Sequence, residues 1–263
     1  MSAVLKSAPA GAKDAAKPMS EDELAGVVKK LLADFGHPRA PIIEKIARGT
    51  ATREQITRLG VYFANFTLIS PNVLGMVYAR CFDLAIRRKM FENLVDEDTG
   101  MRCGDKPHFE LALDFVTRFS GMSEAEVFDY PLPYEVQDVN NFRLRVSRDM
   151  PVMVAMGMFG LAGEASFSPA AAAISDGLRE HYGVKDEDQQ SWIVHIEGDE
   201  EHGEVAEFIL RKKVQALADQ QLCIRLCAEY LDRFQYLWGL AEDPNFKLKR
   251  SALRELEAVL RTA

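Results

Sequence analysis

The chain has 263 residues, of which 48% are hydrophobic and 27% charged, and its formal net charge is −8. This length and apolar content suffice for one large core or two small ones. The negative charge argues against binding to nucleic acid or to an anionic membrane surface. Because the sequence has no run of 18 uninterrupted apolar residues, we expect no membrane-spanning helix.

The N-terminal segment from Met1 to Lys17 is rich in Ala and Lys and has no apolar run of secretory length. We therefore predict a disordered tail over residues 1–18, followed by one domain over residues 19–263. By default, we expect a cytoplasmic protein.

Local signals predict helices along the whole remaining chain. Three capping boxes start at Ser20, Thr52 and Ser123, each with Glu or Gln three residues later. Gly36 and Pro71 mark a helix end and a break. Apolar residues at helical spacing predict further helices over residues 72–98, 108–115, 140–150, 170–182, 205–240 and 251–260. With no convincing alternating strand, we predict an all-α fold in a single compact domain.

The four cysteines, Cys81, Cys103, Cys223 and Cys227, include no CxxC motif. We expect buried free thiols, with a zinc or redox role for the last two left open.

Glu164 is a lone carboxylate in the Met- and Gly-rich helix predicted after Pro151. An unpaired carboxylate in an apolar environment is costly. We therefore expect Glu164 to be paired, protonated or bound to a metal.

The densest group of metal-binding residue types lies in residues 191–204. His195, Asp199 and His202 are spaced i, i+4 and i+7, which places them within about 60° of one another on a helix. Nitrogen and oxygen donors on one helical face suit iron, manganese or zinc. The alternative is a solvated acidic face, because four glutamates crowd the same segment.

Glu97 and His108 offer two more donors, although two glycines and a proline between them favour a bulge or loop over an unbroken helix. Glu92 is a competing carboxylate nearby. With Glu164 and the 195/199/202 stripe, these residues form the inventory of a dinuclear site in a helical bundle. Oxygen and imidazole donors without thiolate favour iron or manganese over zinc.

The order Glu…His, lone Glu, His-x-x-x-Asp-x-x-His resembles the heme-oxygenase-like diiron oxidases and oxygenases. The resemblance covers roughly residues 20–240 and implies a seven-helix bundle, two Fe(II) ions per chain and O2 as co-substrate. In the implied ligand set, one iron takes Glu97, His108 and His202, the other takes His195 and Asp199, and Glu164 bridges or is shared. Which ligands belong to which iron stays open.

This resemblance implies oxidation of a small substrate that carries an amine or a carboxylate, by N-oxygenation, oxidative carbon–carbon cleavage, desaturation or decarboxylation. One alternative is a metal-independent enzyme of the pyrroloquinoline-quinone synthase or thiaminase type, and another is a non-enzymatic helical binding protein. The six-residue ligand set argues against the first alternative, and Glu164 argues against the second. An external electron donor and a homodimer stay open.

Substrate-binding candidates are Tyr62, Phe63, Phe66 and Arg148. Core packing is the alternative for the aromatic residues. Arg148 shares a predicted helix with Arg143 and Arg145, and this group could clamp a carboxylate or form a solvated basic face. His37 and His181 lie near predicted helix ends, and we expect both at the surface.

Overall fold

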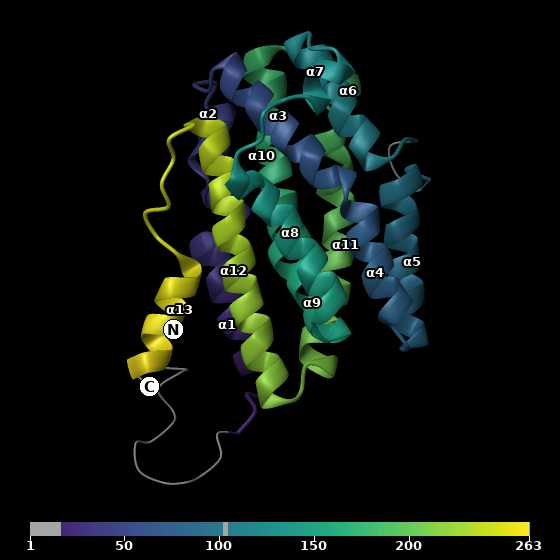
Figure 1. The fold of residues 1–263 in the computed structure, drawn as a ribbon, viewed down its shortest axis with the longest axis vertical. Coiled ribbons are helices and arrows are strands. Elements are labelled where there is room, and N and C mark those ends of the chain that lie inside the picture. The colour runs from purple at the N-terminus through teal and green to yellow at the C-terminus, as the bar shows by residue number, and fades with distance from the viewer. Residues whose placement is uncertain (1–16, 102–104, 263) are drawn as a thin grey trace.

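The computed structural model describes residues 17–101 and 105–262, with the side chains of this set apart from residues 197–202 and 259–262. Across these residues the chain forms helices and no strand, which confirms the all-α prediction. The longer helices run along the long axis of the molecule and pack as a bundle (Figure 1). The predicted tail lies outside the described residues except for Lys17 and Pro18.

The first helices begin and end where local chemistry predicts. α1 (Glu21–Phe35) opens at a capping box, in which the Ser20 hydroxyl accepts from the Glu23 N–H and the Glu23 carboxylate accepts from the Ser20 N–H. A short turn, η1 (His37–Arg39), leads into α2 (Pro41–Ala47), whose first residue is a proline.

The next stretch contains one break that was expected and one that was not. α3 (Arg53–Leu68) and α4 (Ser70–Arg80) are separated at Ile69, and Pro71, which was expected to kink or break the helix, lies in the first turn of α4. The predicted continuous helix over residues 72–98 is wrong, because α5 (Leu84–Thr99) starts anew after residues 81–83. Asp83 caps it by accepting from two backbone N–H groups of its first turn.

By length and composition, Arg53–Arg80 could cross a membrane. Half of its apolar window is buried inside the protein, as a core helix of a bundle requires.

Three helices follow a loop whose centre lies outside the described residues. They are α6 (His108–Ser120), the short α7 (Glu124–Phe128), which has the third predicted capping box, and α8 (Tyr134–Asp149). α8 begins earlier than the prediction of residue 140, directly after Pro133, because proline is compatible with a helix start.

The segment with Glu164 is a π-helix rather than an α-helix. α9 (Val152–Met158) passes into η2 (Phe159–Ala165), and α10 (Ser166–Tyr182) continues from it. Pro169 in α10 has no N–H to donate and crowds the carbonyl of Ala165 four residues earlier, which favours a change of helical pitch at this point.

The C-terminal part contains the two longest helices. After a short turn, η3 (Asp186–Asp188), come α11 (Gln190–Lys213), α12 (Leu217–Glu242) and α13 (Ala252–Thr262). The prediction of one helix over residues 205–240 is wrong, since α11 continues to residue 213 and the chain breaks at residues 214–216.

α11 and α12 organise the core. α11 contacts η2, α10, α9, α1 and α6, while α12 contacts α8, α3, α9 and α13. Each carries one fully buried tryptophan, Trp192 and Trp238. The structure has more helices than the expected seven, because breaks such as the one at Ile69 divide long helices into shorter ones. Cys81, Cys223 and Cys227 are buried free thiols, as expected, and Cys103 lies outside the described residues.

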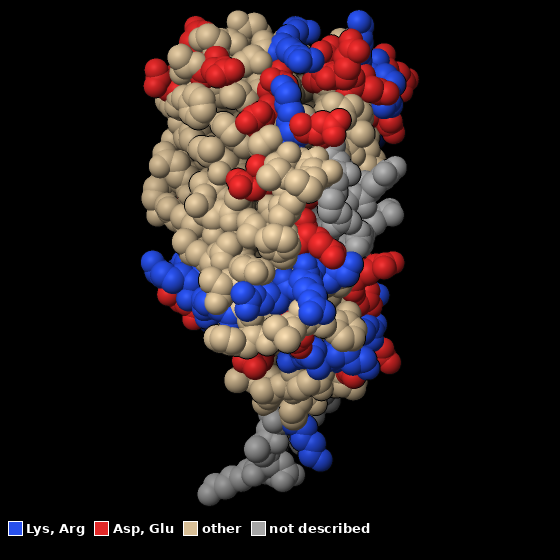
Figure 2. All heavy atoms as spheres, turned by 90° about the vertical axis from the view of Figure 1, so that its right-hand side faces the viewer, with Lys and Arg blue, Asp and Glu red and all other residues tan. Residues whose placement is uncertain are grey.

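Charge is not spread evenly over the surface. Figure 2 shows the side of the molecule that is on the right in Figure 1, with a band of Lys and Arg across its lower half and acidic residues gathered at the upper end. The net charge of −8 therefore coexists with a locally basic band.

Candidate metal centre

Three predicted ligands from three helices converge inside the bundle. Glu97 near the end of α5, His108 at the start of α6 and His195 on α11 place one donor atom each within 4.8 Å of one another. α5 ends at Gly100, whose φ of 64° is in the left-handed region that glycine tolerates. The chain then reverses into α6, so Glu97 and His108 face each other across a loop rather than along one helix.

The environment of Glu97 favours its ionised form. Burial raises the pKa of this carboxyl, but the charges and hydrogen bonding of His108, and then the charge of His195, lower the pKa to about 2. His108 Nδ1 lies 3.4 Å from Glu97 Oε2. An ionised carboxylate beside imidazoles is the donor type that iron or manganese prefers.

The orientation of His195 is set by a backbone carbonyl one turn earlier. His195 Nδ1 lies 2.7 Å from Ser191 O and donates to it, because a carbonyl oxygen can only accept. In the neutral ring this leaves the lone pair on Nε2, and such a hydrogen bond is what orients a metal-binding histidine. Phe63 and Phe167 pack edge-to-face against the ring at centroid distances of 5.4 and 5.3 Å.

Glu164 lies beside this group but outside the three-residue cluster. It projects from η2, and Asn93 Nδ2 donates to its Oε1 at 3.1 Å. Glu164 lines two cavities of about 50 Å³ each, which also share Leu74 and Phe159. The carboxylate thus has a polar partner at the junction of two cavities, as its position in an apolar helix required.

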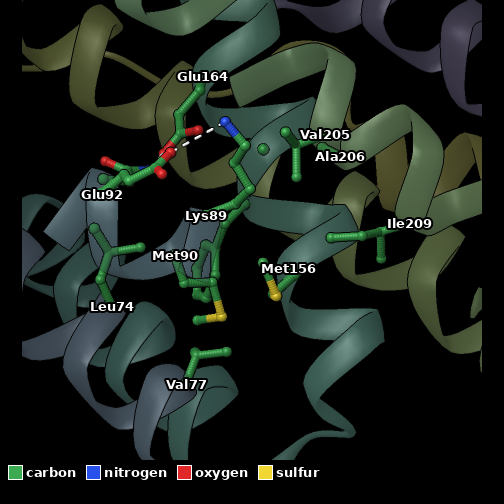
Figure 3. Close-up of a pocket in the computed structure, with 13 residues that line it drawn as sticks. Leu74, Val77, Lys89, Met90, Glu92, Met156, Glu164, Val205, Ala206 and Ile209 are labelled. Atoms are coloured by element: carbon green, nitrogen blue, oxygen red, sulfur yellow. Dashed lines mark hydrogen bonds and ion pairs between the residues drawn. The ribbon is translucent and has the colours of Figure 1, made fainter. Parts of the chain in front are cut away.

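Figure 3 shows the first of these cavities. Glu92, Lys89 and Glu164 gather at one end, and apolar side chains such as Met156 and Ile209 line the other. Glu92 pairs with Lys89 at 3.1 Å, and its side chain is 44% exposed. Glu92 is absent from the donor cluster, so the described geometry favours Glu97 over Glu92 as a ligand.

The side chains of Asp199 and His202 lie outside the described residues. α11 is continuous through both positions. Their assignment as ligands therefore stays a prediction from the spacing and from the resemblance.

The second cavity is lined by part of the predicted substrate set and by one arginine that was not chosen. Phe63 and Phe66 line it, together with Arg143 of α8. Arg148 does not, since its side chain is 71% exposed and holds Asp149 through two hydrogen bonds of 2.8 Å. Helical spacing could have distinguished them, because Arg143 lies on the stripe of buried residues in α8, whereas Arg148 is five positions on and about 140° around the helix.

Tyr62 is buried away from both cavities. Its ring contacts Tyr130 at a centroid distance of 6.4 Å, and it is not among the residues that line either space. Burial, aided by Tyr130, raises the pKa of its phenol to about 12. Tyr62 therefore packs in the core, which was the alternative considered for the aromatic residues.

The expectation of a surface position for His37 is wrong, because the turn after α1 directs its ring inward. His37 is 1% exposed. Its Nδ1 accepts from Trp238 Nε1 at 2.9 Å, so its Nε2–H donates to Ala162 O at 3.1 Å. Burial lowers the pKa of the ring to about 3. A neutral histidine thus ties η2, two residues before Glu164, to α12.

Comparisons with known proteins agree with this arrangement. The model of a family described as iron-containing redox enzymes matches residues 61–234, a range that includes every predicted ligand. A 4-aminobenzoate synthase of Chlamydia pneumoniae is 34% identical over 134 residues, which are 50% of this chain and 56% of that protein. A 4-aminobenzoate synthase of Chlamydia muridarum is 27% identical over 164 residues, 62% of this chain and 66% of that protein. The matches therefore span roughly half to two thirds of these relatives.

Solved structures share the fold at low sequence identity. A CADD-like protein of unknown function from Nostoc punctiforme has a TM-score of 0.65 at 17% identity, covering 86% of this chain and 99% of that one. A TenA homologue from P. horikoshii has a TM-score of 0.64 at 12% identity, covering 84% and 96%. A domain with a heme oxygenase-like fold from Shewanella denitrificans has a TM-score of 0.65 at 13% identity, covering 84% and 89%. The chain therefore belongs to the family of iron-containing redox enzymes, has a heme-oxygenase-like fold and is an oxidoreductase.

Proposed function

We propose that this protein is a non-heme diiron oxidase or oxygenase that uses O2 to oxidise a small organic substrate. The observation that carries the proposal is the convergence of Glu97, His108 and His195 from three helices, with donor atoms within 4.8 Å of one another. Asp199 and His202 on the same helix as His195, and Glu164 beside the cluster, would complete the set for two metals.

The donors present fit iron on chemical grounds. The set combines carboxylate oxygen with imidazole nitrogen and contains no thiolate, which is typical of non-heme iron sites. Glu97 is held ionised, with a pKa of about 2, and so needs no deprotonation on binding a cation at neutral pH. Two ferrous ions held at such a site supply the two electrons for reaction with O2.

The protein's own contribution is to hold the ligands and to limit access of water. The Ser191 carbonyl orients the His195 ring, and the Asn93 amide orients the Glu164 carboxylate. The rings of Phe63 and Phe167 flank His195 and give the site an apolar wall. These two hydrogen bonds would hold the His195 ring and the Glu164 carboxylate in place before the metal arrives.

Our proposal for the substrate is a small molecule with an amine or a carboxylate. The product in the name of the Chlamydia relatives, 4-aminobenzoate, carries both groups. The cavity beside Glu97 has aromatic walls that suit a small apolar or aromatic body. N-oxygenation, oxidative carbon–carbon cleavage and decarboxylation are the reaction classes to screen, with an external electron donor supplied.

The first test is anaerobic titration of metal-free protein with ferrous iron, followed by measurement of O2 consumption on mixing with aerated buffer. We expect about two irons per chain and rapid O2 uptake. Glu97→Gln and His195→Ala should lower iron content, because each removes one donor, whereas Glu92→Gln and the surface variant His181→Gln should retain it. Iron uptake no greater than background would overturn the proposal and favour a metal-independent enzyme.

A further inference from the structure

Arg143 is a buried cation that the ligand set does not use. It lies on α8, is 5% exposed and lines the cavity that also contains Glu97, Glu164 and His195. Its guanidinium stacks on the Phe66 ring with 3.6 Å between Cζ and the ring centroid. A guanidinium stays charged at any pH at which the protein is folded, so this cavity contains a fixed positive charge.

Some of the guanidinium N–H donors form hydrogen bonds with residues of α3, α4 and α8. Nη1 donates to Phe66 O at 2.7 Å and to Asn140 Oδ1 at 3.3 Å, and Nη2 donates to Ser70 Oγ at 2.7 Å. These bonds and the stacking hold the planar group in one orientation. A ligand that binds to it would therefore meet a preorganised surface.

Two N–H donors of Arg143 remain after these bonds. The guanidinium has five donors, three of which are used. Nε is fully buried and has no hydrogen-bond partner among the residues that the structure describes. The second remaining donor is the N–H of Nη2 that does not bind Ser70. A buried donor of a charged group is rarely left without an acceptor, so an acceptor other than the described residues is expected here.

We propose that Arg143 binds the carboxylate of the substrate, and thereby selects anionic substrates for the oxidation proposed above. That the bound molecule is a substrate rests on the proposed oxidase or oxygenase function. That it carries a carboxylate rests on the remaining donors of Arg143. Two donors on neighbouring nitrogens of a planar fork match the two oxygens of a carboxylate. The aromatic side chains of the same cavity would contact the body of the substrate.

The metal ligands explain why the site would work best when loaded. Burial lowers the pKa of the Arg143 guanidinium, whereas the charges of Tyr230, Glu97 and Glu164 raise it. Cations bound by these carboxylates would offset their negative charge and leave the guanidinium to pair with the ligand. We therefore expect stronger carboxylate binding with iron present than without it.

The test uses benzoate and its neutral counterpart benzamide as probes, titrated calorimetrically under anaerobic conditions into the full-length protein with and without ferrous iron. Without O2 no turnover occurs, so binding is measured alone. Iron-loaded wild-type protein should bind benzoate about tenfold or more tightly than benzamide, because only benzoate pairs with the guanidinium. Equal affinities for the two probes would overturn the proposal.

Variants of Arg143 distinguish benzoate that binds to the guanidinium from benzoate that coordinates iron directly. Arg143→Lys keeps the charge but loses the fork, and Arg143→Gln loses the charge; each should abolish most of the preference for benzoate while iron content stays at two per chain. Arg148→Lys, an exposed position on the same helix, should behave as wild type. A preference that survives in Arg143→Lys and Arg143→Gln would overturn the proposal.

The two proposals can fail separately. If iron is not taken up, the diiron function fails, and the benzoate preference of the metal-free protein then decides the carboxylate site by the same comparison. If iron is taken up and O2 consumed but benzoate has no advantage, the diiron function stands and the carboxylate site fails. If neither Arg143 variant folds, the preference of metal-free wild-type protein decides, since no iron is present to bind the probe.

Discussion

The buried ring of His37 predicts a specific loss of stability in mild acid. The ordinary pKa of histidine is 6.5, and burial lowers that of His37 to about 3 in the folded protein. Because the unfolded chain binds a proton more readily, the folded state is favoured fully above pH 6.5 and loses stability as the pH falls toward 3. At pH 5 the difference amounts to about 2 kcal/mol, from about 1.4 kcal/mol per pH unit over the interval below 6.5.

The assay is equilibrium unfolding in urea at pH 8 and pH 5 for wild type and His37→Gln. Glutamine can still donate to Ala162 O, but it does not titrate. We expect the variant to be less stable than wild type at pH 8 by about 1–3 kcal/mol, because the Trp238 indole N–H loses its acceptor. Its further loss between pH 8 and pH 5 should be about 2 kcal/mol smaller than that of wild type.

His181→Gln is the matched control, since it removes a histidine that is 30% exposed at the end of α10. It should lose stability between the two pH values as wild type does. If His37→Gln loses as much stability on acidification as wild type, the inference that His37 is buried and neutral is refuted.

Further predictions concern packing, capping and metal binding. Gly177→Ala should destabilise the fold by about 1–3 kcal/mol, because its Cβ would lie 2.5 Å from a backbone oxygen of α2. Gly26→Ala has open space around its Cβ and should stabilise the fold by about 0.5–1 kcal/mol. Equal effects of the two variants in urea unfolding would contradict this packing. Arg58→Met should lower the free energy of unfolding by about 1–3 kcal/mol, because the Ala241 carbonyl loses its side-chain donor and the Glu242 carbonyl keeps only that of Gln55. An unchanged urea midpoint would argue against this role. Ferrous iron at about 100 times its Kd should raise the free energy of unfolding by about 2.7 kcal/mol for each iron bound. A chelator should reverse this increase, and His195→Ala should lack it in anaerobic thermal melts.

The comparison of Arg143 with Arg148 shows which residues of the cavity could be predicted from the sequence. The group of three arginines was recognised from composition, and the aromatic residues Phe63 and Phe66 were among the candidates. Arg148 lies outside the cavity because it is not on the face of α8 that the valines of this helix share with Arg143. Counting the helical period from the buried valines of α8 would have favoured Arg143.

The sequence by itself determined the features that depend on neighbours a few residues apart. The capping boxes at Ser20, Thr52 and Ser123 were predictable because each bond joins residues three positions apart. The all-α class followed from helical apolar spacing, and the family followed from the types and order of the donor residues. Local signals also account for the errors at residues 81–83 and 214–216, where continuing apolar spacing masked a break.

Only the tertiary structure decided which distant residues meet. Glu97 and His195 are far apart in the chain, and their approach depends on how α5 and α11 pack. The inward position of His37 depends on an acceptor and a donor supplied by η2 and α12. Such contacts depend on loop paths and on helix packing, neither of which a local pattern contains, because the free energy that selects them comes from burying surfaces contributed by the whole chain.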